Sequence, residues 1–276
     1  MLVLLALLYG TMLAGCGPAA VVTRSSPVDG KLMVRVTAGP FLMGTSPVQE
    51  SDLIKKLNLP PNILGSEMPQ ATLALSEFYI DQTPVTNAEY KKFLDSDPQR
   101  DVPFTTVAQA QPANWDRQTR AYPPARAQYP VVLVSWKDAS AYCRWAGKRL
   151  PTEAEWEKAA RGSDGRLWPW GNDWDATRSN GAEQGLLDAT PVGKYSAGAS
   201  PSGALDMAGN VWQWTSTLDK EYPYQPADGR EDTSASGMRV TRGGAFLFGA
   251  AFTRTAARNR FNPDGVSFSI GFRCAG

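Results

Sequence analysis

The sequence has 276 residues, of which 42% are hydrophobic, so it is long enough for one large domain or two small ones with a packed core. Its 28 Lys and Arg nearly balance its 27 Asp and Glu, and a net charge of +1 argues against nucleic acid as a partner. The sequence contains no histidine, which excludes Ser-His-Asp triads, imidazole general bases and histidine metal sites.

The first predicted element is a targeting segment. Residues 2–15 carry no charge, form too short a stretch to cross a membrane, and end in LAGC at residues 13–16, which resembles a bacterial lipobox. We expect residues 1–15 to be a lipoprotein signal peptide, Cys16 to be lipidated, and residues 16–30 to form a flexible tether. An ordinary signal peptide is the alternative. The expected location is the bacterial cell envelope, on the periplasmic face of the outer membrane, because Gly17 resembles an outer-membrane sorting signal.

The cysteines suggest a disulfide. With Cys16 assigned to the lipid, Cys143 and Cys274 remain as an even pair in a compartment that permits disulfides. We predict that these two residues are bonded to each other. Two separate buried thiols are the alternative.

Three predicted helices share one start signal, a Ser or Thr followed three residues later by an acidic residue. This capping-box pattern predicts helices over residues 86–95, 135–147 and 152–162. Glycines at 147 and 162 are typical of helix ends.

Short apolar, β-branched or aromatic runs predict strands at residues 32–36, 41–44, 73–80 and 131–134. The intervening stretches are rich in Gly, Pro, Asn and Asp, above all at 96–129, 162–209 and 219–238. Loops of this length in a compact domain are usually functional or held by ions and disulfides. No repeat or linker divides the chain after the tether, so we expect one domain over residues 31–276.

Several motifs, taken in order, resemble the formylglycine-generating enzyme family, also called the sulfatase-modifying factor domain. They are AGPFLMG at 38–44, FYID with PVTNAEY at 78–90, PVV with SWKDA at 130–139, WAGKRLPTEAEWE at 145–157, WPWGN at 168–172, GNVWQWT at 209–215, RGG at 242–244 and GFRC at 271–274. The resemblance implies a single α+β domain related to the C-type-lectin-like fold, with little regular secondary structure. It also implies a disulfide between the cysteines that match Cys143 and Cys274.

The resemblance also identifies a copper site that this sequence has altered. Active members bind copper through two cysteines after the Arg-Gly-Gly motif and oxidise a substrate cysteine to formylglycine. Here Phe248 matches the first cysteine, Thr253 the second and Ala245 the family's site serine. A phenyl ring, a hydroxyl and a methyl group supply no thiolate for Cu(I), so we do not expect copper chemistry.

Calcium is the cofactor that the resemblance still implies. Its first ligand set would use the side chains of Asp206 and Gln213 and the carbonyls of Gly209 and Val211, oxygen ligands that suit a hard cation. The alternative is that Asp206 and Asn210 only form turns around a buried Trp. A second, weaker set would use Asn180, the Gly181 carbonyl and Asp188.

The family's substrate groove corresponds to the segment from Arg239 to the C-terminus, which has six arginines against one aspartate. The segment predicts a pocket for an anionic or peptide ligand, and our candidate groove residues are Trp212, Phe246, Phe248, Phe252, Arg254 and Arg258. For any one arginine we favour the alternative, an ordinary ion pair or a stack on an aromatic ring.

The sequence is compatible with three functions. The first is a lipid-anchored, non-copper member of the family that binds a periplasmic peptide or protein and serves maturation or assembly. The second is an enzyme with cysteine-independent oxidation chemistry, as in family members linked to pyoverdine maturation, with Glu231, Asp232 and Tyr195 as its candidate residues. The third is calcium-dependent glycan binding, by analogy with lectins.

Overall fold

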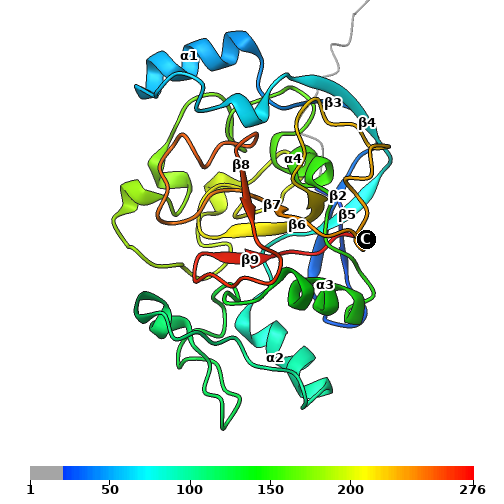
Figure 1. Ribbon diagram of the computed structural model, residues 1–276, viewed down its shortest axis with the longest axis vertical. Coiled ribbons are helices and arrows are strands. Elements are labelled where there is room, and N and C mark those ends of the chain that lie inside the picture. Colours follow the sequence, from blue (N-terminus) through cyan, green and yellow to red (C-terminus); the bar gives the residue numbers. More distant parts are fainter. Residues whose placement is uncertain (1–20) are drawn as a thin grey trace, which may run out of the picture.

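The computed structural model describes residues 21–276 (Figure 1). The predicted signal peptide at 1–15 and the predicted lipidation site Cys16 lie outside the described residues. Within residues 21–276, no helix combines the length and the apolar character needed to cross a membrane.

Each α-helix of the described chain begins at a capping box, in which the first side chain and the side chain three residues later cap each other's backbone. The helices are α1 (Pro47–Leu57), α2 (Asn87–Ser96), α3 (Trp136–Trp145) and α4 (Glu153–Arg161). The three predicted helices are confirmed, whereas α1 was not predicted. Its capping box pairs Ser46 with Gln49 rather than with an acidic residue, and Pro47 occupies the first turn. Short 3-10 segments lie at η1 (Gly65–Glu67), η2 (Ala108–Ala113), η3 (Ala176–Arg178), η4 (Ala182–Gln184) and η5 (Ser196–Gly198).

The strands form three small sheets in the described part of the chain. The first has the order β1-β2-β5 and the second pairs β3 with β4, all antiparallel. The third has the order β8-β7-β6-β9, in which only β6 and β9 run parallel. The strands are β1 (Thr23–Ser25), β2 (Leu32–Val36), β3 (Gly39–Met43), β4 (Ala71–Leu75), β5 (Phe78–Asp81), β6 (Trp212–Leu218), β7 (Arg239–Arg242), β8 (Arg258–Phe261) and β9 (Ile270–Phe272).

Two strand predictions need correction. The run 73–80 is divided between β4 and β5, which belong to different sheets. The run 131–134 is buried but forms no strand, because its amides bond to two separate segments: Val131 N donates to Val85 O and Leu133 N to Ser267 O. Leu133 also has a φ of 60°, which interrupts an extended backbone.

The prediction of a tether over residues 16–30 is wrong for the described part of that range. Residues 23–25 form β1, and the turn after this strand buries Asp29. Asp29 accepts a hydrogen bond from the Tyr142 hydroxyl and lies 2.7 Å from Nζ of Lys148, which also contacts Asp81 at 2.8 Å. This buried charge cluster joins the β1–β2 hairpin to the domain, so the folded part begins before residue 31.

The molecule is a single α+β domain with long loops, as predicted. Figure 1 shows α1 at one end of the long axis, α2 with the segment 97–130 at the other, and the sheet β8-β7-β6-β9 between them. The disulfide between Cys143 and Cys274 is confirmed, with an S–S distance of 2.05 Å, and it joins α3 to the C-terminal segment. The connection between β7 and β8, residues 243–257, contains the copper positions of the family.

Candidate functional site

The β7–β8 connection folds back on itself at its start. Gly243 and Gly244 both have positive φ, and a Cβ on Gly244 would lie 2.7 Å from the Phe252 carbonyl oxygen, so this position requires glycine. The connection is then joined to two other loops, because Phe246 N donates to Asn210 O and Phe248 O accepts from Ala182 N, both at 3.1 Å. Three loops that are distant in the sequence therefore meet at one place.

Phe248, which matches the first copper cysteine, lies in an aromatic cluster. The Phe248 ring packs edge-on against Trp212, with ring centroids 5.5 Å apart, and against Phe252 at 5.9 Å. Ala245 and Thr253 are fully buried. In residues 21–276 no group of three or more His, Cys, Asp or Glu side chains is placed to hold a metal ion.

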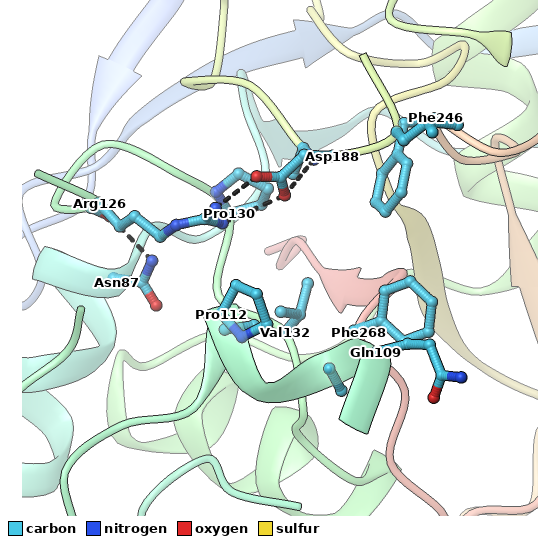
Figure 2. A pocket seen from close by; sticks show the side chains of 13 residues that line it. Asn87, Gln109, Pro112, Arg126, Pro130, Val132, Asp188, Phe246 and Phe268 are labelled. Carbon is cyan, nitrogen blue, oxygen red and sulfur yellow. Dashed lines mark hydrogen bonds and ion pairs between the residues drawn. The ribbon is translucent and has the colours of Figure 1, made fainter. Parts of the chain in front are cut away.

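A cavity of about 140 Å³ lies beside this connection (Figure 2). Figure 2 shows Phe246 and Phe268 on one side of the cavity and the ion pair between Arg126 and Asp188 on another. Arg126 Nη1 donates to Asp188 Oδ1 at 3.2 Å, a second guanidinium nitrogen contacts Oδ2, and Asn87 donates to the Arg126 carbonyl at 2.8 Å. A cavity of this size accepts a group about as large as benzene. It therefore has room for one apolar side chain of a ligand.

Apolar side chains are exposed on the two loops that border the cavity, 181–189 and 243–252. Leu187 lines the cavity and is 71% exposed, and its φ of 53° is a costly conformation for leucine. The other exposed apolar side chains of these loops are Leu186, Leu247 and Phe252. Exposed apolar groups around a concave site are typical of a surface that binds a partner.

The two predicted groove arginines do not face this cavity. Arg254 is buried and donates two hydrogen bonds to Glu67, at 2.8 and 2.6 Å. Arg258 donates to Glu153 at 2.6 Å and stacks on the Tyr222 ring. Both arginines therefore make ordinary structural contacts, an ion pair or a stack on an aromatic ring, as the alternative prediction stated. The same applies to the buried Arg239, Arg242 and Arg273, which bond carbonyls, carboxylates or aromatic faces.

The remaining groove residues divide into two groups. Phe246 lines the cavity, whereas Trp212, Phe248 and Phe252 form the neighbouring aromatic cluster. Asp188, which also lines the cavity, was predicted only as a calcium ligand. Sequence reasoning missed other lining residues, among them Gln109, Arg126, Leu187 and Phe268. Three of these lie in loops that were too long and polar to classify by pattern.

The first predicted calcium set does not fit a cation. Oε1 of Gln213 accepts hydrogen bonds from Nε1 of Trp156 at 2.8 Å and from Nε of Arg273 at 2.6 Å, which occupies both of its lone pairs. Its amide nitrogen donates to the Asp206 carbonyl at 2.7 Å. Asp206 Oδ2 accepts from Gly193 N at 2.7 Å, and burial raises the pKa of this carboxyl group. The Arg273 guanidinium already provides a positive charge beside Gln213. Gln213 therefore does not fit the role of a calcium ligand.

In the described part of the chain, the second predicted calcium set has one free oxygen, on Asn180. Oδ1 of Asn180 is buried and has no hydrogen-bond partner among the described residues, and the same holds for the hydroxyls of Ser179 and Thr190. Asn180 Nδ2 donates to the Asp188 carbonyl at 2.9 Å, while the Asp188 carboxylate pairs with Arg126. Orphaned buried oxygens are costly unless something binds them.

The three candidates for oxidation chemistry are not at the cavity. Glu231 accepts hydrogen bonds from Ser216, Thr217 and Tyr224, and Asp232 is exposed and bonds Ser234. Tyr195 does not line the cavity, and burial together with the Asp206 carboxylate raises its pKa. Asp188 is the carboxylate that lines the cavity, and it is held in its ion pair with Arg126.

Comparisons with known proteins place the chain among close relatives. A family model described as "Sulfatase-modifying factor enzyme 1-like domain" matches residues 19–276. The formylglycine-generating enzyme of Streptomyces coelicolor is 34% identical over 306 residues, covering 94% of this chain and 92% of that protein. The "Inactive C-alpha-formylglycine-generating enzyme 2" of Mus musculus is 32% identical, covering 88% and 85%. The solved structure of PvdO from Pseudomonas aeruginosa matches with a TM-score of 0.71 and 25% identity, covering 94% of this chain and 98% of that one.

Proposed function

The chain belongs to the sulfatase-modifying factor enzyme 1-like family, and from this premise we propose that it is a lipid-anchored periplasmic member that binds a peptide segment of a partner protein, without copper-dependent oxidase activity. Overall similarity does not decide activity, because a relative named as a formylglycine-generating enzyme and one named as inactive match at 34% and 32% identity. The observation that carries the proposal is Phe248, which stands at the first copper-cysteine position and packs against Trp212. Its ring supplies no metal ligand.

The cavity and its rim support peptide binding. A pocket with room for one apolar side chain lies beside four exposed apolar residues of the bordering loops. An extended peptide could place one apolar side chain between Phe246 and Phe268 and direct its backbone toward the Arg126–Asp188 pair. The partner would be a periplasmic protein that is matured or assembled with the help of this chain.

Two features support lipid anchoring in the periplasm. The LAGC sequence at 13–16 suggests lipidation of Cys16. The disulfide between Cys143 and Cys274 suits an oxidising compartment such as the periplasm.

We further propose that the chain binds one calcium ion at the second predicted set, Asn180, the Gly181 carbonyl and Asp188. Among residues 21–276, Oδ1 of Asn180 is the free ligand of this set, and the Asp188 carboxylate would have to exchange its ion pair with Arg126 for the cation. The support is the buried, unpartnered Oδ1 of Asn180. A bound cation would hold the loop 181–189, one wall of the cavity, in place. Neither an oxidation by Glu231, Asp232 or Tyr195 nor glycan binding is favoured by a specific observation.

Site-specific photo-cross-linking in native membranes tests peptide binding. A photoreactive residue is placed at Leu187, on the cavity rim, or at Val48, on α1; both side chains are 71% exposed in the unmodified protein. We expect one protein to be cross-linked through Leu187 and not through Val48, because only Leu187 lines the cavity. Equal cross-linking from both positions would contradict peptide binding at this site.

The absence of oxidase activity needs a separate measurement. The purified full chain is incubated with Cu(I), oxygen and a cysteine-containing peptide, and the Streptomyces coelicolor relative serves as the positive control. We expect mass spectrometry to detect formylglycine with the relative and no change of the peptide with this chain. Formation of formylglycine by this chain would overturn the proposal.

A further inference from the structure

A second hollow lies away from the cavity. It has a volume of about 510 Å³ and is formed by the start of the described chain, the connection between β2 and β3, and the segment that follows α4. Its lining includes Val21, Val22, Arg35, Lys158 and Arg166. None of its lining residues belongs to the candidate site or to a predicted calcium set.

Lys158 gives the hollow an uncompensated positive charge. Its side chain is 5% exposed, and Nζ donates one hydrogen bond, to Gly39 O at 2.8 Å. Among residues 21–276 no carboxylate pairs with it, and burial lowers its pKa. Arg166 pairs with Asp164, and Arg35 lies 3.8 Å from Glu77. A buried ammonium group without a carboxylate partner is unusual, so the hollow suits an anion.

The hollow also lies close in the chain to the predicted lipid anchor. Val21 packs against Gly203, and Val22 O accepts a hydrogen bond from Arg35 N at 2.9 Å, so the chain is held at the hollow from residue 21 onward. Val21 is the fifth residue after Cys16. An extended chain spans at most about 3.6 Å per residue step, or roughly 18 Å over these five steps. A lipid on Cys16 would therefore hold the hollow within about 18 Å of the membrane surface.

We propose that this hollow binds the phosphate of an anionic phospholipid headgroup in the membrane that carries the anchor, with Lys158 as its charge partner. The proposal rests on the lipid anchor of the proposed function. Under this proposal, the side of the domain that carries the hollow faces the membrane. Residues 21–30 are attached to the domain by β1 and by the ion pair of Asp29 with Lys148, so the domain keeps this one orientation.

The test uses the full lipidated chain in nanodiscs of phosphatidylglycerol or of phosphatidylcholine. Lysines are labelled with an amine-reactive reagent, and the rate at each lysine is followed by mass spectrometry. In phosphatidylglycerol we expect labelling of Lys158 to slow about fivefold, the equivalent of one favourable contact with an anionic surface. Labelling of Lys194, which is exposed and does not line the hollow, should be the same in both lipids. Equal rates at Lys158 in the two lipids would overturn the proposal.

A variant pair provides a second readout. Lys158→Met keeps the length of the side chain and removes its charge, and Lys194→Met is the matched control. Native mass spectrometry should find phosphatidylglycerol retained by the unmodified chain and by Lys194→Met, and lost from Lys158→Met. Retention by Lys158→Met would also contradict the proposal.

Two further experiments distinguish a wrong ligand from a missing lipid anchor. In the first, the chain is labelled in detergent without phospholipid, with glycerol phosphate added. If glycerol phosphate slowed the labelling of Lys158 as much as phosphatidylglycerol nanodiscs do, the ligand would be a soluble phosphate, and the proposal that it is a membrane lipid would be overturned. The intact mass reports on Cys16 independently. An unmodified Cys16 would refute the anchor, and with it the membrane source, while the glycerol phosphate arm would still show whether the hollow binds phosphate.

Discussion

At the scale of single residues, the arginines of the C-terminal segment stabilise the fold. Arg254 forms its two hydrogen bonds with Glu67 across 187 residues of sequence, and both side chains are buried. We expect Arg254→Met to lower the free energy of unfolding by about 3 to 5 kcal/mol, because it leaves the Glu67 charge buried and unpaired. Urea unfolding of the disulfide-bonded protein measures this change.

Two further variants show whether the loss of stability in Arg254→Met comes from the unpaired charge of Glu67. Arg260→Met, at a side chain that is 70% exposed, should change the free energy of unfolding by less than about 0.5 kcal/mol. The double variant Glu67→Gln, Arg254→Met should lose less stability than Arg254→Met alone, since it removes the unpaired charge. If Arg254→Met left stability unchanged and weakened partner binding instead, Arg254 would belong to the groove after all.

The lowered pKa of Glu153 makes the free energy of unfolding depend on pH. Burial alone would raise the pKa of this carboxyl group, but Arg242 and Arg258 outweigh burial and hold it below its ordinary 4.5. The folded state therefore gains stability from ionised Glu153 above the unfolded pKa, and loses this gain as pH falls through the lower folded pKa.

The variant Glu153→Gln tests this sign. At neutral pH it should lower the free energy of unfolding by about 3 kcal/mol, because the two arginines lose a buried partner. The difference from the unmodified protein should narrow as pH falls below about 4.5, because the unfolded chain then binds a proton at Glu153 before the folded state does. Urea unfolding across this range measures the difference, and a gap that widened in acid would contradict the assigned direction of the pKa shift.

At the scale of elements, the disulfide links α3 to the C-terminal segment across a separation of 131 residues. Closing so long a loop restricts the unfolded chain, and we expect the double variant Cys143→Ala, Cys274→Ala to lose about 4 to 5 kcal/mol in the chain-entropy description. Guanidinium unfolding of both proteins under oxidising conditions measures the loss. A loss below about 1 kcal/mol would show that the unfolded chain is already restricted in that region.

Helices and strands differed in how well local sequence predicted them. Helices α2, α3 and α4 begin at the expected residues, because a capping box acts within four residues and needs no tertiary partner. The segment 131–134 has strand-forming residues but pairs with two unrelated segments instead of one strand. Strand formation depends on a partner that local sequence does not reveal.

At the scale of the whole molecule, calcium would act by joining loops. We expect calcium at about 100 times its Kd to add about 2.7 kcal/mol of stability and raise Tm by about 5 °C or more over an EGTA-treated sample. Asn180→Ala should abolish this rise. Asp206→Asn, a change in the first predicted set, should keep it, since asparagine also tolerates the φ of 54° at that position. Thermal unfolding measures all three proteins, and loss of the rise in Asp206→Asn with retention in Asn180→Ala would reverse the assignment.

The sequence by itself determined the family, the α+β class, three helix starts and the loss of the copper cysteines. These features depend on residue identity at fixed spacing, and that information is complete in the chain: Phe248 cannot supply a thiolate in any fold. The pairing of Cys143 with Cys274 was also predictable, since these are the cysteines that remain once Cys16 is set aside.

Only the tertiary structure decided which polar groups are free to act. Gln213 and Asn180 are both plausible ligands by sequence, yet Gln213 is occupied by Trp156 and Arg273, whereas Oδ1 of Asn180 has no partner in the described part of the chain. The same holds for Lys158, whose uncompensated charge depends on where distant carboxylates lie. Availability is set by hydrogen bonds and ion pairs between residues far apart in sequence, and the folded chain alone specifies these contacts.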